Sequence, residues 1–136
     1  MKKIFNSFIL VCMILAFTAC SGANGPHTTY DVLTTEFLFS PSKFIVPAGQ
    51  EITLNITNNG AVVHDFVIFK LGTDAGDHFN EEDRPNVYWD VEVQPGESIT
   101  TTFTAPTVPG EYSVTCGIQG HLEAGMSAEL TVVAEE

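Results

Sequence analysis

The stretch "EITLNITNNG", Glu51 to Gly60, alternates apolar and polar residues and then ends in a turn signal. Ile52, Leu54 and Ile56 fall on one face, and threonine and asparagine residues fall on the other. A period of two residues is typical of a β-strand with one buried face, whereas a helix repeats every 3.6 residues. This segment therefore predicts a strand that lies on a hydrophobic core.

The same alternation recurs along most of the chain. It is seen in "ESITTTFT" (97–104), "EYSVTC" (111–116) and "MSAELTVV" (126–133). Proline, asparagine and glycine turn signals separate these segments at 47–49, 58–60, 95–96 and 109–110. No long stretch keeps a helical period, so residues 30–136 are predicted to form one all-β domain. About seven to eight short strands with this spacing indicate a Greek-key β-sandwich.

The stretch "HDFVIFKL" (64–71) departs from the alternation because it is apolar on both faces. Such a strand needs cover on its outer side as well. The acidic insert that follows, residues 72–90, is expected to fold back over the sheet through Phe79, Tyr88 and Trp89. His78 in this insert is interpreted as a surface residue, with a second metal site as the minor alternative.

The N-terminus "MKKIFNSFILVCMILAFTAC" is predicted to be a signal peptide over residues 1–19, because lysines precede a short apolar run. Its last four residues resemble the lipobox of bacterial lipoproteins, in which the cysteine becomes the acylated N-terminus. Residues 20–29 are then the lipidated end and a flexible tether. The protein is expected outside the cytoplasm, lipid-anchored to the membrane through Cys20. The alternative is an ordinary secretory signal in which Cys20 has no role.

The charge and the cysteine content limit the possible partners and the possible state of the one remaining thiol. The chain has 17 acidic and 5 basic residues and a formal net charge of −12. Nucleic acid is excluded as a partner because phosphate binding needs basic residues, and a basic protein partner is favoured. Once Cys12 is removed and Cys20 is acylated, Cys116 is the one remaining thiol. A lone thiol outside the cytoplasm is expected to be buried or bound to a metal.

The loop "CGIQGHLEAGM" places Cys116, His121 and Met126 at equal intervals of five residues. Its glycines allow the chain to reverse between two predicted strands. His64 begins another strand directly after a glycine turn. Because a Greek-key sandwich can bring such strand ends together, we expect these four side chains at one end of the domain.

Two imidazoles, one thiolate and a weak axial thioether form the ligand set of blue-copper electron-transfer sites. Zinc also binds cysteine and histidine, but methionine is not among its usual ligands. The predicted cofactor is one copper ion, cycling between Cu(I) and Cu(II), bound by His64, Cys116, His121 and Met126.

With these residues in place, the chain resembles the cupredoxins, the plastocyanin/azurin family, from about Tyr30 to Val133. The resemblance lies in "FSPSKFIVPAGQEITLNITNNG", "GAVVHDFVI" and "PGEYSVTC", and the Cys-x4-His-x4-Met spacing is similar to that of auracyanin-like members. It implies the same four ligands, with the backbone carbonyl of Val63 as a weak ligand on the opposite axial side. Where the family has asparagine after the first histidine, this chain has Asp65. Its negative charge is expected to favour Cu(II) and to lower the reduction potential.

The predicted function is that of a membrane-tethered one-electron carrier, not an enzyme, working as a monomer with redox proteins. A basic cytochrome c or a membrane oxidoreductase is the expected partner. The alternatives are a copper chaperone or store of the cell envelope, a copper-relay subunit of a larger complex, or a sandwich with a vestigial site. Since His64 is expected to lie deeper, the electron is predicted to leave through His121, with Leu122 and Ile118 as an apolar docking collar.

Overall fold

The structure is a computed structural model that describes residues 25–134. The expected signal peptide and the lipidation site at Cys20 lie outside the described residues. The described part contains nine strands and one short 3-10 helix. In chain order these are β1 (Thr29–Thr35), β2 (Leu38–Ser40), β3 (Lys43–Pro47), β4 (Glu51–Asn58), β5 (His64–Phe69), η1 (Arg84–Asn86), β6 (Val87–Val93), β7 (Ser98–Thr104), β8 (Gly110–Thr115) and β9 (Ser127–Val133).

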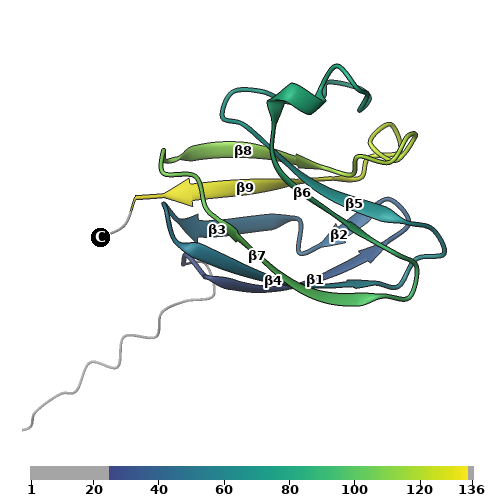
Figure 1. Cartoon of the computed structure of the whole chain (residues 1–136), viewed down its shortest axis with the longest axis horizontal. Helices are drawn as coiled ribbons and strands as arrows, with labels where there is room; N and C mark the ends of the chain where they lie inside the picture. Colours follow the sequence, from purple (N-terminus) through teal and green to yellow (C-terminus); the bar gives the residue numbers. More distant parts are fainter. Residues whose placement is uncertain (1–24, 135–136) are drawn as a thin grey trace, which may run out of the picture.

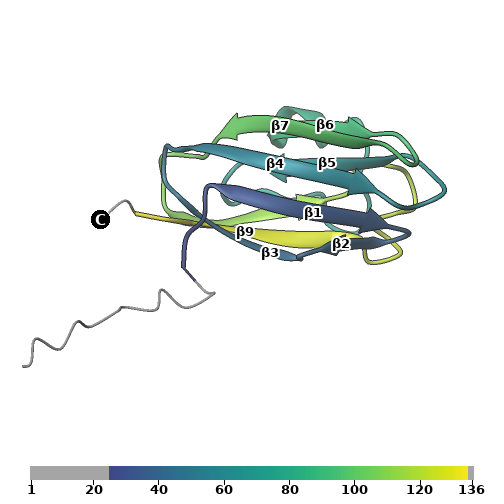
Figure 2. The same cartoon turned by 90° about the horizontal axis from the view of Figure 1, so that it is seen from below.

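The strands form two sheets that face each other across one core (Figures 1 and 2). One sheet has the order β2-β1-β4-β7 and the other the order β3-β9-β8-β5-β6. The predicted all-β sandwich is therefore confirmed. The strand number exceeds the expected seven to eight because the chain changes sheets between β2 and β3. These two short strands flank residues 41–42, and each pairs at the edge of a different sheet.

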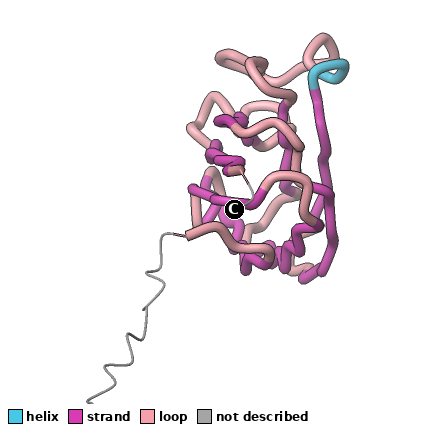
Figure 3. The backbone as a smooth tube through the Cα atoms, turned by 90° about the vertical axis from the view of Figure 1, so that its left-hand side faces the viewer, coloured by secondary structure: helices cyan, strands magenta, loops and turns pink. Residues whose placement is uncertain are grey.

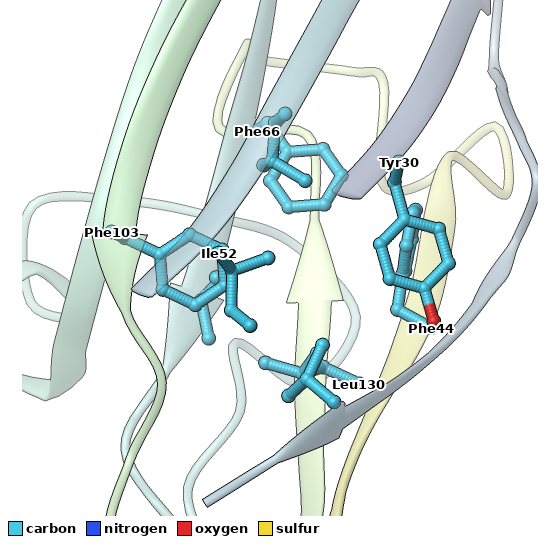
Figure 4. A pocket seen from close by; sticks show the side chains of 9 residues that line it. Tyr30, Phe44, Ile52, Phe66, Phe103 and Leu130 are labelled. Atoms are coloured by element: carbon cyan, nitrogen blue, oxygen red, sulfur yellow. The ribbon is translucent and has the colours of Figure 1, made fainter. Parts of the chain in front are cut away.

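The core lies between the inner faces of the two sheets, as the alternation in β4 predicts. Ile52, Leu54 and Ile56 are at most 2% exposed. Figure 4 shows apolar side chains from both sheets around a cavity of about 10 Å³, with Tyr30 at its edge. The Tyr30 hydroxyl donates to the carbonyl of Ile45 and accepts its N–H, so this polar group is satisfied. A cavity of this size holds at most a single water, so the core offers no small-molecule site.

The insert between β5 and β6 covers the outer face of β5, as expected from the doubly apolar strand. It lies outside the sandwich, beside the five-stranded sheet (Figures 1 and 3). Phe79 packs with Val67 and Phe69 in a second, smaller hydrophobic cluster. Arg84 lies over the Phe79 ring, 4.7 Å from its centroid, and pairs with Asp90 at 3.5 Å. The prediction for Phe79 is thus confirmed.

The predictions for Tyr88 and Trp89 were wrong. Trp89 points into the main core, where its ring lies 5.1 Å from that of Phe103. Tyr88 is exposed, and its hydroxyl donates to the carbonyl of Thr104. Both residues belong to β6, so the alternation of the strand determines which face of the sheet each side chain occupies.

One end of the sandwich gathers the residues of interest. β4 and β8 end there, β5 and β9 begin there, and the loop 116–126 projects from it (Figure 1). β1 begins and β9 ends at the opposite end. Near the start of the described residues, the N–H of His27 donates to the carbonyl of Ile45 in β3. Within residues 25–134 no helix is long and apolar enough to cross a membrane.

Candidate metal centre

Three donor side chains converge at this end of the sandwich. His64 is the first residue of β5, Cys116 follows the last residue of β8, and His121 lies in the loop between β8 and β9. The two Nδ1 atoms are 3.3 Å apart. Cys116 Sγ lies 3.3 Å from His121 Nδ1 and 3.9 Å from His64 Nδ1. In the described part of the chain, this is the one group of histidine, cysteine or acidic residues arranged to hold a metal.

Backbone hydrogen bonds close the loop that carries two of these donors. Cys116 N–H donates to the carbonyl of Met126 over 3.1 Å, and Met126 N–H donates to that of His121 over 3.0 Å. Gly120 and Gly125 have φ values of 85° and 96°, which residues with side chains rarely adopt. The equal spacing thus corresponds to a tight loop that holds the backbone of Met126 next to the other two residues.

All four side chains are withdrawn from solvent. Cys116 and Met126 are fully buried, His64 is 1% exposed and His121 is 8% exposed. His121 is therefore the more accessible imidazole, in the direction predicted, although only a small edge reaches the surface. Such a site excludes water and leaves donors with few alternative positions.

Burial also determines the protonation of the donors. It raises the pKa of the Cys116 thiol, which the N–H of Asp65 opposes by hydrogen bonding to Sγ over 3.4 Å. Burial and the neighbouring His121 lower the pKa of His64. At neutral pH, both shifts favour the uncharged form of these two groups. Metal binding would release the thiol proton, so affinity is coupled to pH.

Asp65 connects the first histidine to the cysteine loop through both backbone and side chain. Its N–H bonds Sγ whatever the side chain is, so this link does not need the asparagine of the resembling family. Its carboxylate lies against Gly117, where an added Cβ would be 2.5 Å from Oδ2. Burial, and secondarily the charge of Asp90, raises the pKa of Asp65 to about 7. In the metal-free chain this carboxyl therefore has less than a full negative charge at neutral pH.

The donor geometry fits a bound transition metal. Metal–nitrogen and metal–sulfur bonds are about 2.0–2.1 Å and 2.3 Å in protein sites, so donors of one ion lie about 3–4 Å apart. The three separations here, 3.3, 3.3 and 3.9 Å, fall in this range. One thiolate, two imidazoles and a buried methionine form a set that suits copper.

Asn58 is a positioning residue that the sequence reading missed. It is fully buried, and its amide donates to the carbonyls of Val62 and Val93 while its oxygen accepts the N–H of Gly60. These bonds shape the loop that delivers His64. The signal was present, because Asn58 continues the inward face of Ile52, Leu54 and Ile56.

Glu36 and Phe37, in the turn between β1 and β2, were also missed. A Glu36 carboxylate oxygen accepts the N–H of Ala61, in the loop before His64. The Phe37 ring meets the His121 ring edge-on, with centroids 5.4 Å apart. The turn contains no glycine or asparagine, so its sequence does not mark it as unusual.

The remaining predicted residues lie as follows. Ile118 and Leu122 are half-buried in the ligand loop, and Val63 is half-buried directly before His64. Their predicted roles, as docking collar and as carbonyl ligand, stay predictions. His78 is exposed and lines a surface groove between the insert and the ligand loop, together with Glu81 and Glu123.

A family model described as a cupredoxin-like domain matches residues 7–132. No curated protein sequence shows significant similarity to the chain. Among solved structures, the sodium-dithionite-reduced auracyanin from the photosynthetic bacterium Roseiflexus castenholzii is 32% identical, with a TM-score of 0.68. The match covers 80% of this chain and 99% of that one.

Two further auracyanins are similar over nearly their whole length. Auracyanin B is 28% identical with a TM-score of 0.65, and the match covers 79% of this chain and 90% of that one. Auracyanin A is described as a "blue" copper protein from the green thermophilic photosynthetic bacterium Chloroflexus aurantiacus. It is 26% identical with a TM-score of 0.63, and the match covers 77% of this chain and 98% of that one.

Proposed function

The chain belongs to the family of cupredoxin-like domains, and we propose that it is a blue copper protein that carries single electrons at the cell envelope. The observation that carries the proposal is the convergence of His64, Cys116 and His121 with their donor atoms 3.3–3.9 Å apart. The auracyanin neighbours, one of them described as a blue copper protein, support the same conclusion.

Each residue has a defined part in such a site. His64 and His121 present Nδ1, and Cys116 presents a thiolate in the same small volume. Met126 would supply a thioether as a weak ligand, and the backbone carbonyl of Val63 would be a further weak ligand. Copper, when bound, supplies a couple that gains or loses one electron. The protein's contribution is a site whose geometry suits both oxidation states.

Burial favours a carrier over a copper chaperone or store. A protein that hands over its metal needs donors that an acceptor can reach. Here three of the four donors are at most 1% exposed, and hydrogen bonds close the ligand loop. A copper-relay subunit of a larger complex uses the same chemistry. Transfer from the purified chain to a free partner protein distinguishes that role from a mobile carrier.

The proposed partner is a basic redox protein such as a cytochrome c, because the formal net charge is −12. We expect the bimolecular rate of electron transfer to a basic cytochrome c to fall steadily as salt is added. Screening shortens to about 8 Å at physiological ionic strength, which weakens steering between opposite charges. Stopped-flow kinetics at several salt concentrations measure this, with an acidic cytochrome as the control. A rate that is flat or rises with salt for the basic protein would argue against it as the partner type.

The proposed location is outside the cytoplasm, with the domain tethered through an acylated Cys20. We expect Cys20→Ser to move the protein from the membrane fraction to the soluble fraction. Acyl chains contribute about 0.8 kcal/mol of membrane binding per buried CH₂, so their loss removes the anchor. Fractionation and mass spectrometry of the N-terminal peptide measure the change, with Cys12→Ser as the control. Unchanged membrane association of an unacylated variant would refute the lipid anchor.

A further inference from the structure

The turn between β1 and β2 touches both loops that carry the histidine donors. Glu36 accepts a hydrogen bond from Ala61 N–H, three residues before His64. The next residue, Phe37, places its ring edge-on against the ring of His121. Two consecutive side chains of one turn therefore reach two loops that are far apart in the sequence.

The backbone of Phe37 is strained. Its φ is 62°, and it is the one residue other than glycine with positive φ in the described part of the chain. Bulky side chains rarely adopt this conformation, and it persists where the surrounding structure imposes it. The burial of Phe37 does not account for it, because 45% of the residue remains exposed. The contact that accompanies the strain is the one with His121.

Glu36 packs as closely on the other loop. A Cβ added at Gly60 would lie 3.0 Å from Glu36 Oε1 and 2.8 Å from His64 Nε2. The Glu36 carboxylate and the His64 imidazole thus both lie close to Gly60. The Glu36 contact and the His64 ring are parts of one packed unit.

We propose that Glu36 and Phe37 are positioning residues that act as a clasp, which holds the His64 loop and the His121 ring in the relative arrangement that metal binding needs. The inference rests on the proposed function for its purpose, but the two contacts can be tested on protein without copper. The strained backbone of Phe37 is retained because the ring it presents keeps His121 in place and shields it from water.

The decisive variant is Phe37→Gly, because it removes the ring and relieves the backbone strain together. A residue that only supports the fold would lose stability on this change. We expect the unfolding midpoint of the metal-free full-length chain to stay the same or to rise, because relief of the left-handed backbone at position 37 offsets the lost ring contacts. We also expect the rate at which diethylpyrocarbonate modifies His121 to rise by about two- to tenfold, which corresponds to the loss of one aromatic edge contact.

The chain provides its own references for this experiment. His27 and His78 are exposed, so their modification rates, read by peptide mass spectrometry, should not change. Phe37→Tyr keeps the ring and should restore slow modification of His121. Val108→Ala removes an exposed apolar side chain at the opposite end of the sandwich and should leave His121 unaffected.

A second measurement tests whether the two contacts act as one unit. If the Glu36 and Phe37 contacts depend on each other, Phe37→Gly also speeds hydrogen exchange at Ala61 N–H, in the other loop. Glu36→Ala should do the same, whereas Glu36→Gln should not, since its amide oxygen can still accept the bond. The proposal is overturned if Phe37→Gly leaves the exchange rate of Ala61 N–H unchanged. It is also overturned if His121 of this variant is modified at the same rate as in the parent chain. Both readouts use metal-free protein, so their failure is separate from a failure to bind copper.

Discussion

Cys116→Ser abolishes the intense visible colour that we expect of the copper-loaded chain. That colour arises from charge transfer between a thiolate and Cu(II), and a serine hydroxyl cannot supply it. The substitution also replaces a fully buried donor 3.3 Å from His121 Nδ1 with a harder, weaker one. We therefore expect the visible band to disappear and the affinity for Cu(I) to fall by at least about tenfold, in keeping with the preference of soft ligands for Cu(I). Optical titration and competition with a Cu(I) chelator measure the two effects.

Met126→Leu is the matched control for this experiment. It removes a sulfur of similar burial from the same loop but leaves the thiolate and both imidazoles in place. This variant should stay strongly coloured while its reduction potential changes, because the axial ligand tunes the potential. If Cys116→Ser remains as strongly coloured as Met126→Leu, the assignment of Cys116 as the thiolate ligand is wrong.

Gly117→Ala should damage the site and the fold together. An added Cβ would lie 2.5 Å from Asp65 Oδ2 and 3.0 Å from Val67 Cγ2. Both neighbours are buried in β5 beside His64, so they have little room to move. Overpacking of this kind costs about 1–3 kcal/mol of folding free energy. We expect a loss in that range in denaturant unfolding of the metal-free chain, and a distorted copper spectrum.

Asp65→Ala provides the control, because it removes the closer of the two clashing groups. The double variant should recover part of the stability that Gly117→Ala loses, so the two changes should be non-additive. Strictly additive losses would mean that the carboxylate does not press on Gly117. The side-chain contact between Asp65 and the cysteine loop would then be refuted, whereas the bond from Asp65 N–H to Cys116 Sγ would be unaffected.

Much of the fold could be predicted because burial on one face leaves a period of two in the sequence. The alternation of Ile52, Leu54 and Ile56 predicted β4, and the doubly apolar stretch 64–69 predicted the cover that Phe79 supplies. The prediction for Trp89 failed because this residue belongs to β6 and not to the insert. Its alternation with Val91 and Val93 would have placed it on the inner face of β6.

The donor set could be read from the sequence because its spacing and residue types are unusual together. The residues that position these donors could not be predicted from the sequence, and the physical reason differs from one residue to the next. Asn58 looked like part of a turn, although its register on β4 points inward. The left-handed backbone of Phe37 has no sequence signal, since it depends on a tertiary contact with His121. Glu36 likewise acts on a loop 25 residues away, which pattern reading cannot detect.

A visible spectrum shows whether this end of the sandwich is a redox-active copper site. The full-length chain is titrated with Cu(II), reduced with ascorbate and then reoxidised. We predict an intense blue or green colour that saturates at one equivalent of copper, bleaches on reduction and returns on oxidation. A faint colour typical of Cu(II) bound to nitrogen and oxygen ligands, or an intense colour that reduction does not reversibly bleach, would contradict it.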